Sequence, residues 1–399
     1  MKRFFKTLLF ASVATLTLAS CGAKEAKVVT KENIKVGLIT LHDNTSTYDK
    51  NFIDSMKAAV KSLGLKEDQL VIRSNVEENN DCYEEAARLA KSCDVVFADS
   101  FGHEDYMIKA AKEFKNVLFA HATGTKAHTE KLENFGNAFA NIYEGRYLAG
   151  VAAGMKLNEM ISQGKIKENE AKMGYVGAFP YAEVKSGYTS FFLGARSVCP
   201  SVTMEVKFTN SWYDLTQENE VAKKLIANKC VLISQHADSM GAPNACEEAN
   251  VPNVTYNGTT VASCPKTYLV SSKIDWEPYF KHLIETKING GKLEYDWCGT
   301  LANGAVALDA VGSSAAAGTQ AKIDEVKAKL VAGTLHVFEI SKFKVNGKNL
   351  TTYKADVDSD PNFTPDTEVI SNGYFHESEY RSAPYFDIDI DGITILSDK

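Results

Sequence analysis

The stretch DVVFADSFGHEDYMIKAAKEFKNVLFA, residues 94–120, decides the fold class. Two short apolar runs, at 94–98 and 117–120, flank a segment at 106–114 that is expected to be helical. Near-continuous apolar strands that alternate with helices are typical of a parallel sheet with helices on both faces. The stretch therefore predicts an α/β protein with a parallel sheet.

The same alternation extends in both directions from this stretch. Upstream we expect, in order, a strand at 34–40, a helix at 49–63, a strand at 70–72 and a helix at 84–90. After residue 140 we expect strands at 173–177, 202–208, 231–234 and 253–256, with helices at 187–197 and 215–228 between them. A chain of 399 residues has room for two domains. The pattern thus predicts two doubly wound lobes.

The later part of the chain divides between these lobes. A helix at 276–286 is expected to return to the first lobe, while the tail adds a helix at 323–330 and late strands that include 386–393. We therefore assign residues 34–140 and 272–300 to lobe 1, and residues 141–271 and 301–399 to lobe 2.

A segment rich in small residues, 144–155, marks the crossing between the lobes and holds the GxxxG pair Gly150 and Gly154. It is about half as long as a membrane span. We expect a helix that packs tightly on a sheet, and not a transmembrane dimer.

The first residues resemble an export signal. Lys2, Arg3 and Lys6 precede an apolar stretch too short to span a bilayer, and Leu18-Ala19-Ser20-Cys21 follows. These four residues resemble a bacterial lipobox, in which the Cys21 thiol is lipidated. We expect a signal peptide at 1–20, a tether at 21–33 and a mature chain held at the extracytoplasmic face of the cell membrane by its lipid. The alternative is plain secretion with an incidental cysteine.

Charge and cysteine spacing exclude several classes of partner. Loss of residues 1–20 removes three basic residues and no acid, so the net charge falls from −7 to −10, which opposes nucleic-acid binding. The seven cysteines beyond Cys21 show no metal-binding spacing. We expect no metal and mostly buried thiols, with one or two disulfides left open.

Residues that follow the expected strands should line a cleft, because ligands of open α/β sheets bind beyond the carboxyl ends of the strands. These residues are aromatic and polar together, and they comprise Asp43, Tyr48, Phe101, Gly102, Trp212, Asp238 and Asn257. Two facing lobes could stack a flat ring between the aromatic side chains, while Asp43, Asp238 or Asn257 bonds to its edge. Taken singly, each aromatic residue could instead belong to the core.

Catalytic and cofactor motifs are missing. The sequence holds no GxSxG, HExxH or phosphate-binding loop. His121, His236 and Asp238 could form an acid/base group with Ser100 or Ser239, but without a nucleophile turn we expect hydrogen-bonded histidines. The sequence therefore favours a binding protein without a cofactor over an enzyme.

Several segments together resemble the basic membrane lipoprotein family of solute-binding proteins. They are TYDKNF at 47–52, YEGRYLAGVAAG at 143–154, NSWYD at 210–214, QHAD at 235–238 and YN at 256–257. The resemblance implies a type I periplasmic-binding-protein fold, with two Rossmann-like lobes joined by a three-strand hinge. It also implies a monomeric receptor of an ABC importer that closes on a purine nucleoside or nucleobase and delivers it to a permease.

Carried over by position, the family pattern makes Tyr48, Trp212 and Phe101 stacking residues and adds Lys273 to the polar set. This chain has Asn257 where relatives commonly have an acid, which leaves the identity of the ligand open. The alternatives are a receptor for a sugar or signalling molecule, an exported nucleoside hydrolase on the same scaffold, and a surface adhesin.

Overall fold

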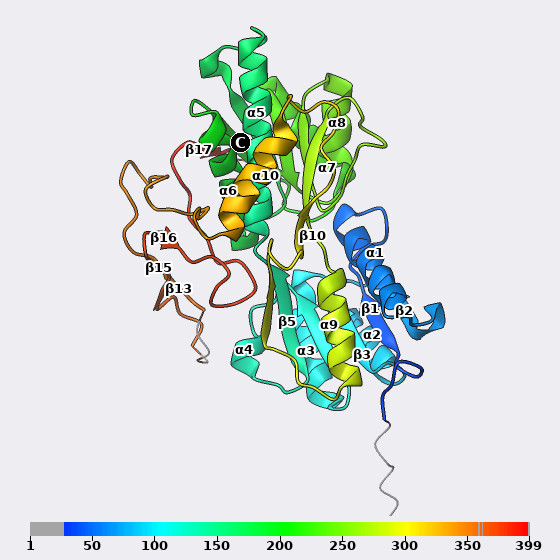
Figure 1. The fold of residues 1–399 in the computed structure, drawn as a ribbon. Helices are drawn as coiled ribbons and strands as arrows, with labels where there is room; N and C mark the ends of the chain where they lie inside the picture. The colour runs from blue at the N-terminus through cyan, green and yellow to red at the C-terminus, as the bar shows by residue number, and fades with distance from the viewer. Residues whose placement is uncertain (1–27, 358–359, 361, 398–399) are drawn as a thin grey trace, which may run out of the picture.

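Two open sheets, each covered by helices on both faces, form two lobes that lie end to end (Figure 1). The computed structural model describes residues 28–357, 360 and 362–397. The predicted signal peptide at 1–20 and the lipidation site Cys21 lie outside the described residues. The last part of the predicted tether is attached to lobe 1, because the Gln69 amide donates to the Lys31 carbonyl at 2.8 Å. Among the described helices, none combines the length and apolar character needed to cross a bilayer.

The sheet of lobe 1 is entirely parallel and has the strand order β11-β5-β4-β3-β1-β2. Its strands are β1 (Val36–Ile39), β2 (Leu70–Arg73), β3 (Val95–Ala98), β4 (Leu118–Ala122), β5 (Phe135–Ala140) and β11 (Asp296–Gly299). This arrangement confirms the parallel sheet predicted from residues 94–120.

Helices cover both faces of this sheet because neighbouring strand residues point to opposite sides. On one face, Phe97 packs against Phe52 of α1 and Phe280 of α9, and on the other Val96 joins the cluster of α2 and α3. The helices of lobe 1 are α1 (Thr47–Ser62), α2 (Asn80–Ala90), α3 (Glu104–Glu113), α4 (Ala127–Glu130) and α9 (Glu277–Ile288), with short 3₁₀ turns η1 (Glu67–Gln69) and η2 (Phe101–His103).

Lobe 2 repeats the design with the strand order β12-β10-β9-β8-β6-β7-β17, in which only β12 is antiparallel. Its strands are β6 (Lys172–Gly177), β7 (Thr203–Phe208), β8 (Leu232–His236), β9 (Asn253–Tyr256), β10 (Tyr268–Ile274), β12 (Val306–Leu308) and β17 (Ile393–Ile395). Its helices are α5 (Ile142–Ser162), α6 (Ala182–Val198), α7 (Leu215–Ala227), α8 (Gly241–Ala249) and α10 (Thr319–Val331), with the 3₁₀ turn η3 (Glu168–Glu170).

The glycines of the crossing helix α5 pack mainly against another helix, and not against a sheet as expected. A Cβ added at Gly150 would lie 2.0 Å from the Phe191 carbonyl oxygen of α6, and one at Gly154 would lie 2.5 Å from the Ala195 oxygen. The small residues therefore let the α5 and α6 backbones approach closely, at a place where any side chain would separate them.

Three crossovers join the lobes, between β5 and α5, between β10 and α9, and between β11 and β12. The boundary predicted at residue 272 falls inside β10, whose whole length belongs to the second sheet, so the chain crosses after Ile274. The hinge is therefore formed by three connections, as a type I periplasmic-binding-protein fold requires.

A long C-terminal segment, described at residues 341–357, 360 and 362–397, is mostly irregular and lies along the side of the molecule (Figure 1). Its short strands before β17 are β13 (Lys354–Ala355), β14 (Thr367–Glu368), β15 (Ile370–Ser371) and β16 (Tyr374–Phe375). The strand predicted at 386–393 is wrong, because only Ile393–Ile395 pairs with a neighbour. The alternation is real all the same: Phe386, Ile388 and Ile390 are buried, while the aspartates between them are exposed.

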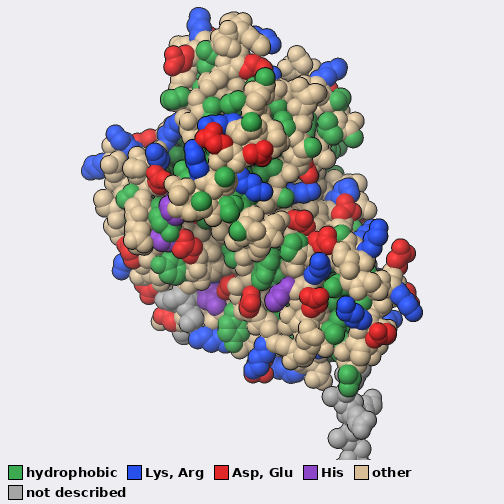
Figure 2. Space-filling model, viewed as in Figure 1, with side chains coloured by type: hydrophobic (Ala, Val, Ile, Leu, Met, Phe, Trp, Pro, Cys, Tyr) green, Lys and Arg blue, Asp and Glu red, His purple; other side chains and the backbone are tan. Residues whose placement is uncertain are grey.

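Charged side chains of both signs share the surface, and the described cysteines are mostly buried. Figure 2 shows Lys and Arg interspersed with Asp and Glu over the face in view. The seven described cysteines are free thiols, six of them buried and Cys298 half-buried. The expectation of mostly buried thiols is confirmed for the described part of the chain.

Candidate ligand-binding cleft

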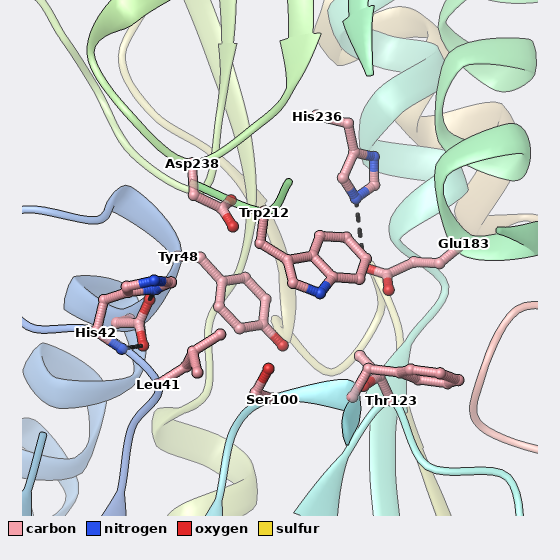
Figure 3. A pocket seen from close by; sticks show the side chains of 11 residues that line it. Leu41, His42, Tyr48, Ser100, Thr123, Glu183, Trp212, His236 and Asp238 are labelled. Atoms are coloured by element: carbon pink, nitrogen blue, oxygen red, sulfur yellow. Dashed lines mark hydrogen bonds and ion pairs between the residues drawn. The ribbon is translucent and has the colours of Figure 1, made fainter. Parts of the chain in front are cut away.

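A cavity lies between the two lobes at the carboxyl ends of their strands (Figure 3). The space not filled by protein atoms measures about 380 Å³, some of it open to solvent. It is lined by Leu41, His42, Tyr48, Asp49, Ser100, Phe101, Thr123, Glu183, Trp212, His236 and Asp238. Both lobes thus contribute side chains to one site.

The start of α1 holds the lobe 1 wall in place. Ser46 caps the helix by accepting from the Asp49 backbone N–H, and the Asp49 carboxylate accepts from the His42 backbone N–H at 2.7 Å. The Tyr48 hydroxyl donates to the Asp99 carbonyl at 2.8 Å. Because its polar end is bound to backbone, the Tyr48 ring is fixed with its flat face available to the cavity.

Aromatic side chains brace the lobe 2 wall. The Trp212 ring meets the Phe179 ring edge-on at a centroid distance of 5.0 Å and the Tyr181 ring at 6.0 Å. Across the cleft, the Tyr181 ring lies 5.6 Å from the Phe101 ring of lobe 1. Trp212 therefore reaches the cavity as part of a packed aromatic group.

A hydrogen-bonded chain runs from the interior of lobe 2 to the cavity. Buried Arg146 donates to the Tyr175 hydroxyl at 2.6 Å, Tyr175 lies 3.4 Å from His236 Nδ1, and His236 Nε2 lies 3.3 Å from the Glu183 carboxylate. Burial lowers the pKa of His236, so the ring is neutral. A neutral His236 with its proton on Nε2 donates to Glu183 and accepts from Tyr175, which orients the Glu183 carboxylate toward the ligand space.

Asp238 supplies a second carboxyl group. Burial raises its pKa well above the usual range, and the negative charge of Asp49 adds to the effect. A carboxyl group that keeps its proton can donate one hydrogen bond and accept another. Asp238 can therefore bond to a ring edge that presents a donor beside an acceptor.

The charge of the lining selects against anions. None of the eleven residues around the cavity is Lys or Arg, whereas three of them are Asp or Glu. An anionic ligand would meet the Glu183 carboxylate with no Lys or Arg in the lining to offset its charge. The cavity therefore suits a neutral or cationic ligand with flat apolar faces and polar edges.

Four of the eight predicted ligand residues, Tyr48, Phe101, Trp212 and Asp238, line this cavity. Asp43 and Gly102 do not. The Asp43 carboxylate accepts from the backbone N–H and hydroxyl of Thr45, bonds that lower its pKa. The Gly102 N–H donates to Glu78 at 2.7 Å. Both residues shape their loops instead of facing the ligand space.

Asn257 and Lys273 line a separate cavity between α1 and the β10 edge of lobe 2. Lys273 Nζ lies 2.8 Å from Asp309, which neutralises its charge. Thr47, which also lines this second cavity, donates its backbone N–H to the Asp238 carbonyl at 2.9 Å. This contact between the lobes separates the two cavities in the closed cleft.

The sequence prediction missed Glu183 and did not select His42, Ser100 or Thr123 as ligand residues. Glu183 follows β6 by six residues, so the rule that ligand residues follow strands applied to it as well. Because Glu183 lies in the first turn of α6 and not in the loop after β6, a search of the loop residues did not include it. Among the described residues no group of His, Cys, Asp and Glu could hold a metal ion.

Comparison with known sequences places this architecture in a family. Residues 36–340 match the Bmp family model, described as ABC transporter substrate-binding protein, PnrA-like. The chain is 32% identical over 287 residues to a purine-binding protein of Brucella abortus, a match that covers 71% of this chain and 75% of that protein. It is 32% identical over 252 residues to TsgA13 of Haloferax volcanii, to which glucose binding for an ABC transporter is ascribed; that match covers 63% of this chain and 60% of TsgA13.

Solved structures of solute-binding proteins share the fold. One from Conexibacter woesei superposes with a TM-score of 0.61 at 19% identity and covers 76% of this chain and 98% of its own. Another, from Aeropyrum pernix, has a TM-score of 0.65 at 14% identity and covers 76% of this chain and 93% of its own. The sequence match decides the family: the chain belongs to the Bmp family of ABC transporter substrate-binding proteins.

Proposed function

We propose that this protein captures a purine nucleoside or nucleobase in the cavity between its lobes and delivers it to an ABC permease. The observation that carries the proposal is the pairing of Tyr48 from lobe 1 and Trp212 from lobe 2 in one cavity, with Asp238 and Glu183 beside them (Figure 3). Two aromatic rings can enclose a flat base, and the carboxyl groups can bond to its edge.

The chemistry of the lining supports a purine over a charged metabolite. A purine edge offers ring nitrogens and exocyclic groups that both donate and accept, which matches the Asp238 carboxyl group, whose pKa is raised by burial, beside the Glu183 carboxyl group that His236 orients. The purine-binding relative from Brucella abortus adds support from sequence. Each aromatic contact contributes about 1–3 kcal/mol, so two of them contribute about 2–6 kcal/mol, and satisfied edge bonds add to this.

A sugar is the second candidate, favoured by the glucose-binding role ascribed to TsgA13. Sugar sites also use aromatic faces and carboxylates. The cavity lining offers carboxylates but neither Arg nor Lys, so a purine fits its flat walls better than a ring of hydroxyl groups does.

Calorimetry tests the purine proposal. The mature chain is unfolded and refolded to remove bound ligand, then titrated with adenosine, guanosine, inosine, adenine and glucose. We expect saturable binding of at least one purine and none of glucose. If glucose binds and the purines do not, the second candidate is correct; if none binds, the purine proposal is wrong.

We further propose that the ligand leaves unchanged. Two histidines line the cavity. His236 has a lowered pKa and is hydrogen-bonded to Tyr175 and Glu183, and the His42 ring lies 3.5 Å from the Asp49 carboxylate, so neither ring is bonded to a serine or a cysteine. Incubation of the protein with the bound nucleoside should release no free base, as measured by chromatography. Release of base in proportion to protein concentration would identify a hydrolase instead.

Attachment through Cys21 at the extracytoplasmic face of the membrane is part of the proposal and rests on the sequence Leu18-Ala19-Ser20-Cys21. Cells that express the full chain should incorporate labelled palmitate into it, and Cys21→Ser should abolish the label. A Cys21→Ser chain that is still labelled and still found with the membrane would contradict this assignment.

A further inference from the structure

A side compartment adjoins the cleft cavity, and the C-terminal segment forms one of its walls. The compartment has about 660 Å³ of unfilled space, part of it open to solvent. It is lined by Phe101, Thr123, Thr125, Pro180, Tyr181, Ala182, Glu183, Arg381, Ala383, Pro384 and Asp387. Phe101, Thr123 and Glu183 line the cleft cavity as well, so the two spaces adjoin at these three residues.

The wall contributed by the C-terminal segment is fixed to both lobes. On lobe 2, Lys185 of α6 lies 2.8 Å from Asp387, and the Tyr188 hydroxyl lies 3.1 Å from Asp389. On lobe 1, Asp296 of β11 accepts from the Ser382 backbone N–H at 2.9 Å and from its hydroxyl at 2.8 Å. Residues 381–387 therefore extend from one lobe to the other at the mouth of the cleft.

The part of this wall that the C-terminal segment contributes lies beyond the range of the family match. The Bmp family model matches residues 36–340, and all four wall residues from the C-terminal segment come after that range. The family match therefore assigns no role to the part of the compartment wall that the C-terminal segment contributes.

The walls present apolar surface to the compartment. The Phe101 and Tyr181 side chains are 41% and 45% exposed, which is high for rings whose centroids lie 5.6 Å apart. The other apolar lining residues are Pro180, which is exposed, Ala182, which is half-buried, and Ala383 and Pro384, which are buried. The exposed aromatic rings and Pro180 at the mouth of a binding cleft are suited to an apolar group of a ligand.

The charged groups of the compartment exclude a phosphate. The Arg381 guanidinium is directed to backbone carbonyls, with Nη1 donating to Asp356 at 2.9 Å and Nε to Ala383 at 3.3 Å. The remaining charged lining residues are the acids Glu183 and Asp387. A phosphate placed here would face the Glu183 carboxylate and the Asp387 carboxylate that is paired with Lys185, while three N–H groups of Arg381 already donate to backbone carbonyls.

We propose that the ligand carries a neutral, partly apolar substituent beyond the ring held in the cleft cavity, and that the side compartment receives it. The inference rests on the proposed function, since it takes a purine in the cleft cavity as its starting point. It makes the C-terminal segment a specificity element that distinguishes substituted purine nucleosides from their parents and from nucleotides.

Binding of substituted ligands tests the inference. The refolded mature chain is titrated with adenosine, guanosine and inosine, with analogues bearing a benzyl or alkyl group at the exocyclic nitrogen, C8 or the 5′ position, and with the 5′-phosphates. We expect at least one neutral analogue to bind as tightly as its parent or tighter, and the 5′-phosphate to bind at least tenfold more weakly. The inference fails if every neutral analogue binds tenfold or more weakly than its parent, or if the phosphates bind best.

Two variants that fill the compartment locate the substituent. Thr125→Trp and Ala182→Phe fill it from opposite walls and lie outside the cleft lining, so we expect each to lose at least tenfold in affinity for the substituted analogue and to keep parent binding. Thr286→Trp, on the outer end of α9, is the matched control and should bind both ligands normally.

The outcomes separate the two proposals. If Thr125→Trp and Ala182→Phe bind the substituted analogue as tightly as wild type does, the side compartment does not receive the substituent, and the purine proposal still stands. Failure of every parent and analogue to bind wild type would overturn both.

Discussion

Trp212 is the residue whose loss should cost most at the site. It reaches the cavity from the loop after β7 and is braced by Phe179 and Tyr181. We expect Trp212→Ala to weaken purine binding by roughly 5- to 150-fold, which corresponds to about 1–3 kcal/mol for one stacking contact. Trp212→Phe keeps a ring in place and should recover most of the affinity. Calorimetry of both variants checks this, and equal losses would show that Trp212 acts through packing and not through a ring face.

Glu377 makes stability depend on pH. It is almost fully buried in the C-terminal segment, and burial raises its pKa to about 7 from an ordinary value near 4.5. Between these values the unfolded chain loses the proton first, so the free energy of unfolding falls as pH rises from about 4.5 to 7, by about 3 kcal/mol in total. Below about pH 4.5 the folded and the unfolded chain both hold the Glu377 proton, and above about pH 7 both have lost it. Outside this window Glu377 therefore no longer changes the free energy of unfolding with pH.

Urea unfolding of wild type and Glu377→Gln between pH 4.5 and 8 measures this effect. We expect the variant to gain stability relative to wild type as pH rises. Parallel curves for the two proteins would show that the Glu377 proton is bound no more tightly in the folded state.

At the scale of elements, the contact between α5 and α6 depends on glycine. Alanine favours a helix over glycine by about 1 kcal/mol, but a Cβ at Gly150 would lie 2.0 Å from a backbone oxygen of α6. Because that oxygen belongs to a helix backbone, the helices must separate, and we expect a net destabilisation of about 2 kcal/mol or more.

Thermal or urea unfolding of Gly150→Ala checks this, with Gly258→Ala as the control. No atom lies within 4 Å of the Cβ position at Gly258, so that variant should change stability by less than about 0.5 kcal/mol. A Gly150→Ala protein as stable as the control would mean that α5 and α6 can move apart without cost.

The sequence predicted the positions of the strands better than it predicted whether a segment pairs with a neighbouring strand. Apolar runs placed β1, β3 and β6 within a few residues of their observed bounds, because strands buried on both faces leave a strong signal. The alternation at 386–390 was equally clear, yet it reflects burial against α6 without a neighbouring strand. Periodicity reports which side chains are buried, and it does not report what the backbone bonds to.

At the scale of the whole molecule, the C-terminal segment should slow the release of ligand. It is anchored on lobe 2 and bonds to Asp296 of lobe 1, so opening of the cleft must break the Ser382 contacts. Removing the hydroxyl bond with Ser382→Ala costs the closed form about 0.5–1.5 kcal/mol, which predicts about two- to tenfold faster dissociation.

Stopped-flow fluorescence with the purine that binds wild type measures this rate. Ser341→Ala, an exposed serine of the same segment, is the control and should release ligand at the wild-type rate. Equal rates for the two variants would show that the cleft opens without breaking the Ser382 contacts.

The arrangement of the two lobes explains which site residues could be predicted. Tyr48, Trp212 and Asp238 come together because the carboxyl ends of parallel strands from two lobes face one another, which the strand order alone implies. Asn257 and Lys273 follow the same rule, but the contact between Thr47 and Asp238 places them in a second cavity. The separation of the two cavities depends on how far the lobes close, which strand order does not determine.

The last strand of the chain has a consequence for solubility. β17 pairs along β7 and so covers the outer edge of the second sheet. An uncovered edge strand offers free N–H and C=O groups to any other extended chain. A protein shortened before Ile393 would therefore tend to aggregate through β7 even if both lobes folded correctly, and its insolubility would be a property of that exposed edge.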